Sequence, residues 1–174
     1  MPEKTARDVT IPLDQYPHAV ETQSLKDAVE LLEAAQIEFE GSVSMPRILL
    51  VFDENKQLVG MARRRDILRG LEPRFREELE ISHPEAHFKT EIDPNLSDLV
   101  NAEDIDRLKR KLESPLTDVV RELPGHVDAD DSLMRVVREL VGKDTHIAAV
   151  LVDGEVVGVV RSLDVLRAVT ADLI

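Results

Sequence analysis

An internal repeat constrains this chain more than any other feature of its sequence. When residues 58–71 are aligned with residues 156–169, six of the fourteen positions are identical, whereas ordinary residue usage gives about one identity by chance. Most of the other positions exchange one apolar residue for another. The identical pairs include Val59/Val157, Gly60/Gly158, Arg63/Arg161 and Asp66/Asp164. Such self-similarity indicates one supersecondary unit that occurs twice.

An amphipathic helix is predicted near the start of each copy. Apolar residues recur at i, i+3, i+4 and i+7 from Leu25 and again from Leu133, which is the spacing of one buried helix face. Ser24 and Ser132 precede these stripes, where a hydroxyl can cap the helix. A short extended segment leads into each helix, at residues 19–21 and 127–128.

Two strands and a closing helix complete each copy. Residues 48–52 and 147–152 are continuous apolar runs, as expected of strands covered on both faces. Polar turns follow, the second an Asp-Gly hairpin signal, and partner strands return at 58–62 and 156–160. Closing helices are predicted at 67–70 and 165–168, opened by Asp66 and Asp164. The first copy is ten residues longer, and eight of these lie within residues 33–47.

A charged segment separates the two copies. Residues 72–114 contain Pro73, Pro84 and Pro94, yet apolar spacing within the segment favours a helical connector. Residues 102–112 begin with acids and end with bases, the order that the helix dipole favours. A second helix is predicted at residues 74–81.

The composition excludes several kinds of site and partner. The chain has 174 residues, no cysteine and a formal net charge of −13, so disulfides, thiolate metal sites and a cysteine nucleophile are excluded. Because a surface this acidic repels phosphate backbones and anionic lipid, we expect neither nucleic acid nor a membrane as a partner. No secretory signal or apolar run long enough to span a membrane is evident, which gives a cytoplasmic location as the default expectation.

The repeated closing pattern, LVGMARRRDIL and VVGVVRSLDVL, resembles that of the CBS domain pair, the cystathionine-β-synthase-type tandem repeat or Bateman module. This resemblance implies an α/β (α+β) fold of two β-α-β-β-α units, at 8–71 and 115–169, packed about a pseudo-twofold axis with the 72–114 connector between them. It also implies a regulatory module whose clefts bind an adenosine-containing ligand such as AMP, ATP or S-adenosylmethionine.

The resemblance also assigns candidate ligand-binding residues. A family Asp that contacts ribose matches Asp66 and Asp164, and a carboxylate can accept hydrogen bonds from both ribose hydroxyls. The backbone that borders adenine corresponds to His18, Val20, His126 and Val127. The family's phosphate-binding Thr or Ser is replaced by Arg63 and Arg161, while Ser162 follows one residue later in the second copy. The Pro common in the middle strand is also absent, with Leu50 and Val150 in its place.

Each of these features also has a structural explanation. An Asp at a helix start can cap backbone N–H groups, and Gly60 and Gly158 can serve strand packing rather than ligand approach. The run Arg63-Arg64-Arg65 is read either as surface salt bridges or as an anion site. His83 and His87 flank a proline, which favours a loop over a metal site.

Three functions remain in order of preference. The first is a regulatory module that binds an adenine nucleotide or similar ligand and acts on a regulated partner protein. The second is a homodimeric interaction scaffold with a degenerate cleft, favoured by the loss of Thr or Ser from both copies. The third is an enzyme, and we expect none because no catalytic constellation or metal site stands out.

Overall fold

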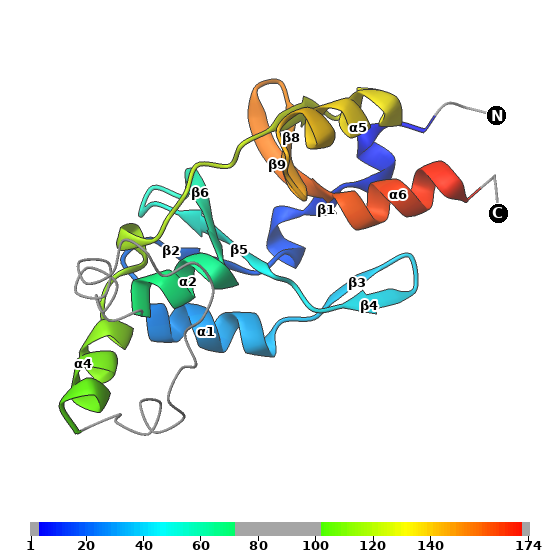
Figure 1. The fold of residues 1–174 in the computed structure, drawn as a ribbon. Coiled ribbons are helices and arrows are strands. Elements are labelled where there is room, and N and C mark those ends of the chain that lie inside the picture. Colours follow the sequence, from blue (N-terminus) through cyan, green and yellow to red (C-terminus); the bar gives the residue numbers. More distant parts are fainter. Residues whose placement is uncertain (1–3, 72–101, 172–174) are drawn as a thin grey trace, which may run out of the picture.

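The two copies of the repeat fold into two equivalent units in the computed structural model, which describes residues 4–71 and 102–171 (Figure 1). Each unit has the predicted order of strand, helix, two strands and helix. The first unit comprises β2 (His18–Val20), α1 (Leu25–Ala34), β5 (Ile48–Phe52), β6 (Leu58–Arg63) and α2 (Arg64–Leu71). The second comprises β7 (His126–Asp128), α5 (Leu133–Gly142), β8 (Ile147–Val152), β9 (Glu155–Arg161) and α6 (Ser162–Thr170).

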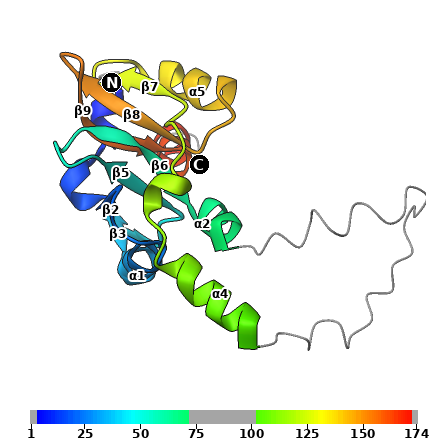
Figure 2. The same ribbon diagram turned by 90° about the vertical axis from the view of Figure 1, so that its left-hand side faces the viewer.

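Further elements lie outside the repeated order. They are β1 (Ile11–Pro12), the hairpin β3 (Ile37–Phe39) and β4 (Ser42–Ser44), α4 (Ala102–Leu112), and three short 3-10 helices at Ala6–Val9, Leu13–Gln15 and Leu116–Asp118. The β3–β4 hairpin lies within residues 33–47, which hold eight of the ten extra residues of the first copy. Helix α4 confirms the prediction at 102–112 and extends away from the two units (Figure 2). The helix predicted at 74–81 lies outside the described residues.

The sheets pair as expected within each unit and exchange a segment between units. In both, the leading strand pairs parallel with the middle strand, which pairs antiparallel with the last. Strand β1, at the start of the chain, joins the second unit by pairing with β9, where Ile11 lies opposite Val159. Arg121, in the segment leading into the second copy, forms the equivalent bridge to Met61 of β6. Each unit therefore completes its sheet with the leading segment of the other copy.

Gly60 and Gly158 make this exchange possible. A Cβ built on Gly60 would collide with the carbonyl oxygen of Arg121, and one on Gly158 with that of Ile11. Only glycine permits so close an approach of two backbones. Of the two roles considered for these residues, the geometry matches strand packing.

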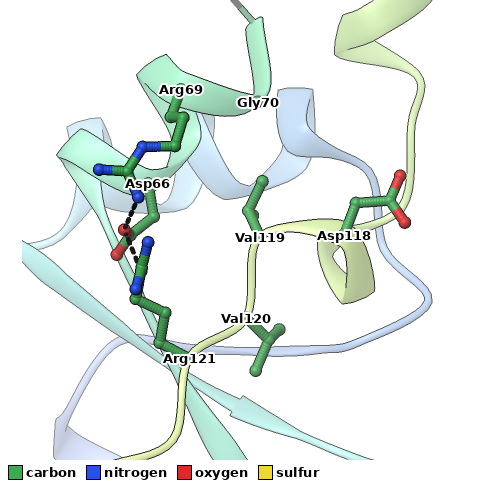
Figure 3. A pocket seen from close by; sticks show the side chains of 7 residues that line it. All are labelled: Asp66, Arg69, Gly70, Asp118, Val119, Val120 and Arg121. Atoms are coloured by element: carbon green, nitrogen blue, oxygen red, sulfur yellow. Dashed lines mark hydrogen bonds and ion pairs between the residues drawn. The ribbon is translucent and has the colours of Figure 1, made fainter.

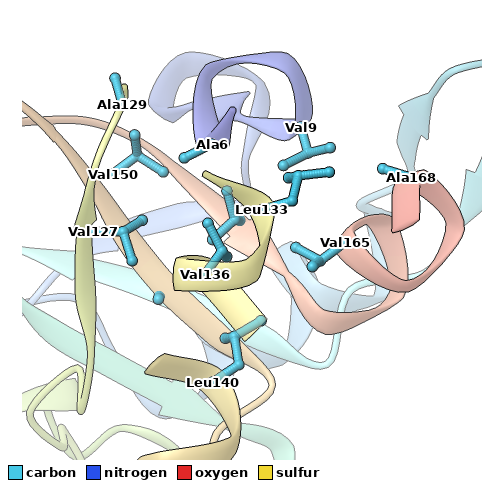
Figure 4. Close-up of a cluster of buried hydrophobic side chains, with 12 residues drawn as sticks. Ala6, Val9, Val127, Ala129, Leu133, Val136, Leu140, Val150, Val165 and Ala168 are labelled. Atoms are coloured by element: carbon cyan, nitrogen blue, oxygen red, sulfur yellow. The ribbon is translucent and has the colours of Figure 1, made fainter. Parts of the chain in front are cut away.

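Alternate residues of the central strands face different cores. In β5, Leu49 and Val51 pack beneath α1 and α2, and β8 is arranged in the same way beneath α5 and α6 (Figure 4). Leu50, from the opposite face of β5, joins a third core between the two sheets. The helices thus cover the outer faces and the sheets face each other, so any cleft between the units is lined by strands and leading segments.

The local signals of the sequence are confirmed with one correction. Ser24 and Ser132 cap α1 and α5 by accepting hydrogen bonds from backbone N–H groups three residues on. The closing helices begin two residues before Asp66 and Asp164, at Arg64 and Ser162. The prediction that these Asp residues open the helices is therefore wrong, and Arg64 and Arg65 belong to α2.

Candidate functional site

Asp66 is the centre of a cluster of arginines. Its side chain is only 2% exposed, and it lies in the first turn of α2. Arg63, the last residue of β6, donates from Nε at 2.7 Å and from a terminal nitrogen at 3.0 Å. Arg121 donates from Nε at 2.6 Å, and Arg69 lies 3.8 Å away on the next helical turn. The backbone N–H of Arg63 adds a fourth hydrogen bond.

These contacts fix the ionisation of Asp66. Burial alone would raise its pKa, but the hydrogen bonds from Arg63 and Arg121 outweigh burial and lower the pKa to about 2. A carboxylate has roughly four lone-pair positions, and the four hydrogen bonds occupy them. A contact from Asp66 to a ribose would therefore require one guanidinium to move away. The backbone bond also gives Asp66 part of the capping role considered from the sequence.

A cavity of about 260 Å³ opens beside this cluster (Figure 3). Asp66, Arg69 and Gly70 line one side, and residues 118–121 line the other. The cavity therefore lies between α2 and the segment that leads into the second copy. The contact of Arg121 with Asp66 was not predicted from the sequence, because a lone arginine in a loop carries no periodic or motif signal.

Asp164, the equivalent residue of the second unit, has a closed environment. Arg161 donates to both of its oxygens, at 2.6 and 2.9 Å, and the Arg161 side chain is itself only 11% exposed. The remaining terminal nitrogen of Arg161 donates to the Ser44 hydroxyl at 2.8 Å. Since Ser44 belongs to β4, the hairpin peculiar to the first copy holds this arginine in place. The two arginines at the repeated position thus bind their own Asp residues in both units.

Tyr16 is a further buried residue near the Arg161–Asp164 pair. It is 3% exposed and belongs to the core between the sheets. Burial raises the pKa of its phenol to about 12, with smaller opposing effects from Arg161 and Asp164. This tyrosine follows the 3-10 helix Leu13–Gln15, which lengthens the first leading segment relative to the second. Neither Tyr16 nor Ser44 was singled out by sequence analysis, because their partners are more than 100 residues away.

A second cavity, of about 360 Å³, lies between the two units. The first unit contributes Leu58, Val59 and Gly60 from β6, and the second contributes strand residues of β8 and β9. Glu122, Leu123 and Gly125 from the connecting segment and His126, the first residue of β7, complete its lining. Its lining is mostly apolar, with the carboxylate of Glu122 and the imidazole of His126 as the side chains that can hydrogen bond.

The pseudo-equivalent positions in the other half carry larger side chains. The strand registers place Leu50 where the second unit has Ala149, and Phe52 where it has Leu151. Leu50 is fully buried, and the ring of Phe52 packs edge-on against His18 at 5.8 Å between centroids. Larger side chains thus occupy one cleft, while Ala149 leaves the other open.

The structure places the remaining predicted site residues in different surroundings. His126 lines the open cavity, while His18 lies in the filled half with its Nδ1 2.8 Å from the Tyr16 carbonyl oxygen. Val127 is buried in the core of the second unit, and the backbone N–H of Val20 donates to the Gln23 side chain. The Ser162 hydroxyl lies 3.5 Å from His146 Nδ1 at the start of α6. Asp66 and Asp164 therefore belong to two separate sites.

Two β-α-β-β-α units that exchange leading segments and face each other through their sheets define a tandem-repeat module with two composite clefts. The profile of the CBS domain matches residues 6–73 and 115–171. The chain belongs to the CBS domain family, as the closing pattern indicated.

Solved structures agree with this fold. A CBS domain-containing protein of unknown function from Kribbella flavida is 17% identical, with a TM-score of 0.68 over 97% of this chain and 99% of that one. CBSX2 in complex with AMP is 20% identical, with a TM-score of 0.61 over 98% of each chain. The CBS domain of a bacterial CNNM/CorC family Mg²⁺ transporter in complex with ATP is 16% identical, with a TM-score of 0.61 over 96% of this chain and 87% of that one. No curated protein matches the sequence.

Residues 4–71 and 102–171 also bear on metal binding and on membrane insertion. No group of three or more metal-ligating side chains gathers there. Of the helices in this part of the chain, none has the length and apolar character needed to cross a bilayer.

Proposed function

We propose that this chain is a regulatory module that binds an adenosine-containing nucleotide in the 360 Å³ cavity between its two units. One observation carries the proposal: residues of both units line this cavity, together with Glu122, Leu123 and Gly125 of the segment that connects them. Its volume falls in the range of about 300–1,000 Å³ typical of ligand pockets. A ligand held there touches both units at once.

The lining suits a purine nucleoside. Apolar side chains such as Leu58 and Val156 offer surfaces for the faces of a base, while His126 and Glu122 can hydrogen bond to its edge or to ribose. The AMP and ATP complexes of proteins with this fold support a nucleotide as the ligand class. We assign the position of adenine to His126 rather than to His18, because Phe52 packs against His18.

One nucleotide per chain is expected. The second cleft is occupied by Tyr16, Leu50 and Phe52, and Arg161 is fixed between Asp164 and Ser44. Sensing follows if the nucleotide has different affinities for two relative positions of the units, because only such a difference can shift their equilibrium. A regulated partner protein then binds one of these positions in preference to the other.

Calorimetric titration with AMP, ADP, ATP and S-adenosylmethionine tests the proposal. We expect one site per chain for at least one of them. Ala149→Leu places the residue of the filled half into the open cavity and is expected to abolish binding. Val157→Leu is the matched control, because Val157 lies on β9 outside the cavity lining and is 41% exposed. No binding of any ligand at millimolar concentration would refute the proposal, as would full binding by Ala149→Leu.

The alternative is a homodimeric interaction scaffold with no ligand. The saturation of both Asp residues by arginine favours it, as do the exposed apolar side chains Leu68 on α2 and Leu166 on α6, which are 67% and 61% exposed. Light scattering over a range of protein concentrations tests this scaffold. A dimer that Leu68→Glu and Leu166→Glu dissociate supports it, whereas a monomer at all concentrations contradicts it.

A further inference from the structure

We propose that the outer face of the first unit, formed by α1 and α2, binds the same face of a second copy of this chain. The two helices cover one core, to which Leu25, Ala28 and Ile67 contribute, and they lie beside each other over the same sheet (Figure 1). Their solvent sides therefore form a single surface. The contact goes beyond the nucleotide cleft, because none of the residues that line the 360 Å³ cavity belongs to either helix.

The two helices carry opposite net charges. Their charged residues are Lys26, Asp27, Glu30 and Glu33 on α1, and Arg64, Arg65, Asp66 and Arg69 on α2. The net charge is therefore −2 for α1 and +2 for α2. The side chain of Asp66 is buried, and Asp27 is half-buried where it accepts a hydrogen bond from the backbone N–H of Ser24. The exposed side of α1 thus presents a lysine and two acids, while that of α2 presents three arginines.

Several of these exposed charges have no ion-pair partner within the chain. Glu30, Glu33 and Arg65 are exposed, and no salt bridge in residues 4–71 and 102–171 involves any of them. The other two arginines of α2 already have contacts, one with the carbonyl oxygen of Pro46 and one with Asp66. Two acids and one arginine are therefore available for a partner outside the chain.

A twofold axis between α1 and α2 makes this face self-complementary. The axis places α1 of one copy opposite α2 of the other, and each contact occurs twice. Glu30 and Glu33 then lie opposite the arginines of α2 in the second copy, which is an attractive arrangement. Leu68 of α2 is 67% exposed in the single chain, and its removal from water in this contact favours association.

The second unit does not provide an equivalent surface. Helix α5 has a net charge of +1 and α6 of 0, in place of −2 and +2. Arg138 occupies the repeat position of Glu30, so the charge on the exposed side of this helix is reversed. The same twofold contact between second units would bring Arg135 and Arg138 toward Arg167 of the other copy, which is repulsive. Charge therefore selects the first unit as the contact between copies.

Light scattering and analytical ultracentrifugation over a range of protein concentrations test the contact. We expect a dimer whose dissociation constant rises with salt concentration, because exposed charges are screened. Glu30→Lys and Arg65→Glu should each weaken the dimer by at least about tenfold, since the twofold axis makes every lost pair and every new repulsion occur twice. Arg138→Glu is the matched control on α5 and should dimerise like the unaltered chain.

A mixture of two variants separates a lost contact from a misfolded chain. Chains with Glu30→Lys repel one another, as do chains with Arg65→Glu, but an equimolar mixture restores both attractive contacts and should form a heterodimer. A monomer of the unaltered chain at all concentrations would overturn the proposal. Equal weakening by Arg138→Glu, or failure of the mixture to associate, would also overturn it.

Two further variants distinguish this contact from the other proposals. Leu68→Glu should dissociate the dimer and Leu166→Glu should leave it intact, whereas a scaffold joined through both closing helices loses its dimer in both variants. Dissociation by Leu166→Glu would therefore overturn a contact confined to the first unit. Ala149→Leu, which tests the nucleotide cleft, should leave the dimer unchanged. A monomer that binds one nucleotide would support the cleft and refute this contact, so the two proposals fail separately.

Discussion

Neutralising the two repeated Asp residues should have unequal costs. The pKa of Asp66 is lowered from 3.8 to about 2, and a difference of this size corresponds to about 2 kcal/mol of stability at neutral pH. Asp66→Asn removes this contribution, but Arg63 and Arg121 are 40% and 46% exposed and can return to water. We therefore expect a loss of about 2 kcal/mol.

Asp164→Asn should cost more. Its partner Arg161 is 11% exposed and is held on the other side by Ser44, so the unpaired guanidinium cannot reach water easily. Removing one member of a buried pair costs about 3–5 kcal/mol. The two equivalent substitutions thus differ because one arginine cluster is open and the other is closed.

Urea unfolding at pH 7, followed by circular dichroism, measures both losses. The midpoints should fall with unchanged m-values, further for Asp164→Asn than for Asp66→Asn. Asp118→Asn is the control, because Asp118 is exposed and should change stability by no more than about 0.5 kcal/mol. An Asp66→Asn variant that is less stable than Asp164→Asn would refute this reasoning.

Three further predictions concern stability. Gly60→Ala should destabilise the chain by more than about 1 kcal/mol in the same urea assay, because the added Cβ meets the Arg121 carbonyl oxygen. Gly142→Ala is its control and should be neutral or stabilising, because Gly142 lies at the end of α5 with open space around it. Ser44→Ala should lower the free energy of unfolding by about 1–3 kcal/mol through loss of the hydrogen bond from Arg161. Ser42→Ala serves as its control, and equal effects of the two substitutions would contradict this. The pKa of Asp66 is depressed in the folded state, so the stability that Asp66 contributes is present above about pH 4 and is lost as the pH falls toward 2. The free energy of unfolding should therefore depend less steeply on pH over that range in Asp66→Asn. An unchanged dependence would contradict the lowered pKa of Asp66.

Local signals in the sequence predicted most of the fold. The serine caps, the apolar central strands and the Asp-Gly turn depend on neighbouring residues, and all are present in the structure, the turn with positive φ at Asp153 and Gly154. The boundary of the closing helices was misplaced by two residues, because Arg64 and Ser162 continue the helix before the repeated Asp.

The exchange of leading segments and the composition of the sites could not be predicted in this way. Strand β1 has two residues and no periodicity, and its pairing with β9 joins residues nearly 150 positions apart. Arg121 reaches Asp66 through the same kind of long-range exchange. The repeated identities located both Asp–Arg pairs, but only the differing neighbours, such as Ala149 against Leu50, make one half open and the other closed.

A crystal structure of the chain grown with AMP or ATP tests the central claim most directly. The account predicts one nucleotide per chain, with its base between β6 and β7 beside His126 and Ala149, and none beside Asp164 and Tyr16. A nucleotide bound beside Asp164, or an open cavity without nucleotide at saturating concentration, would contradict it.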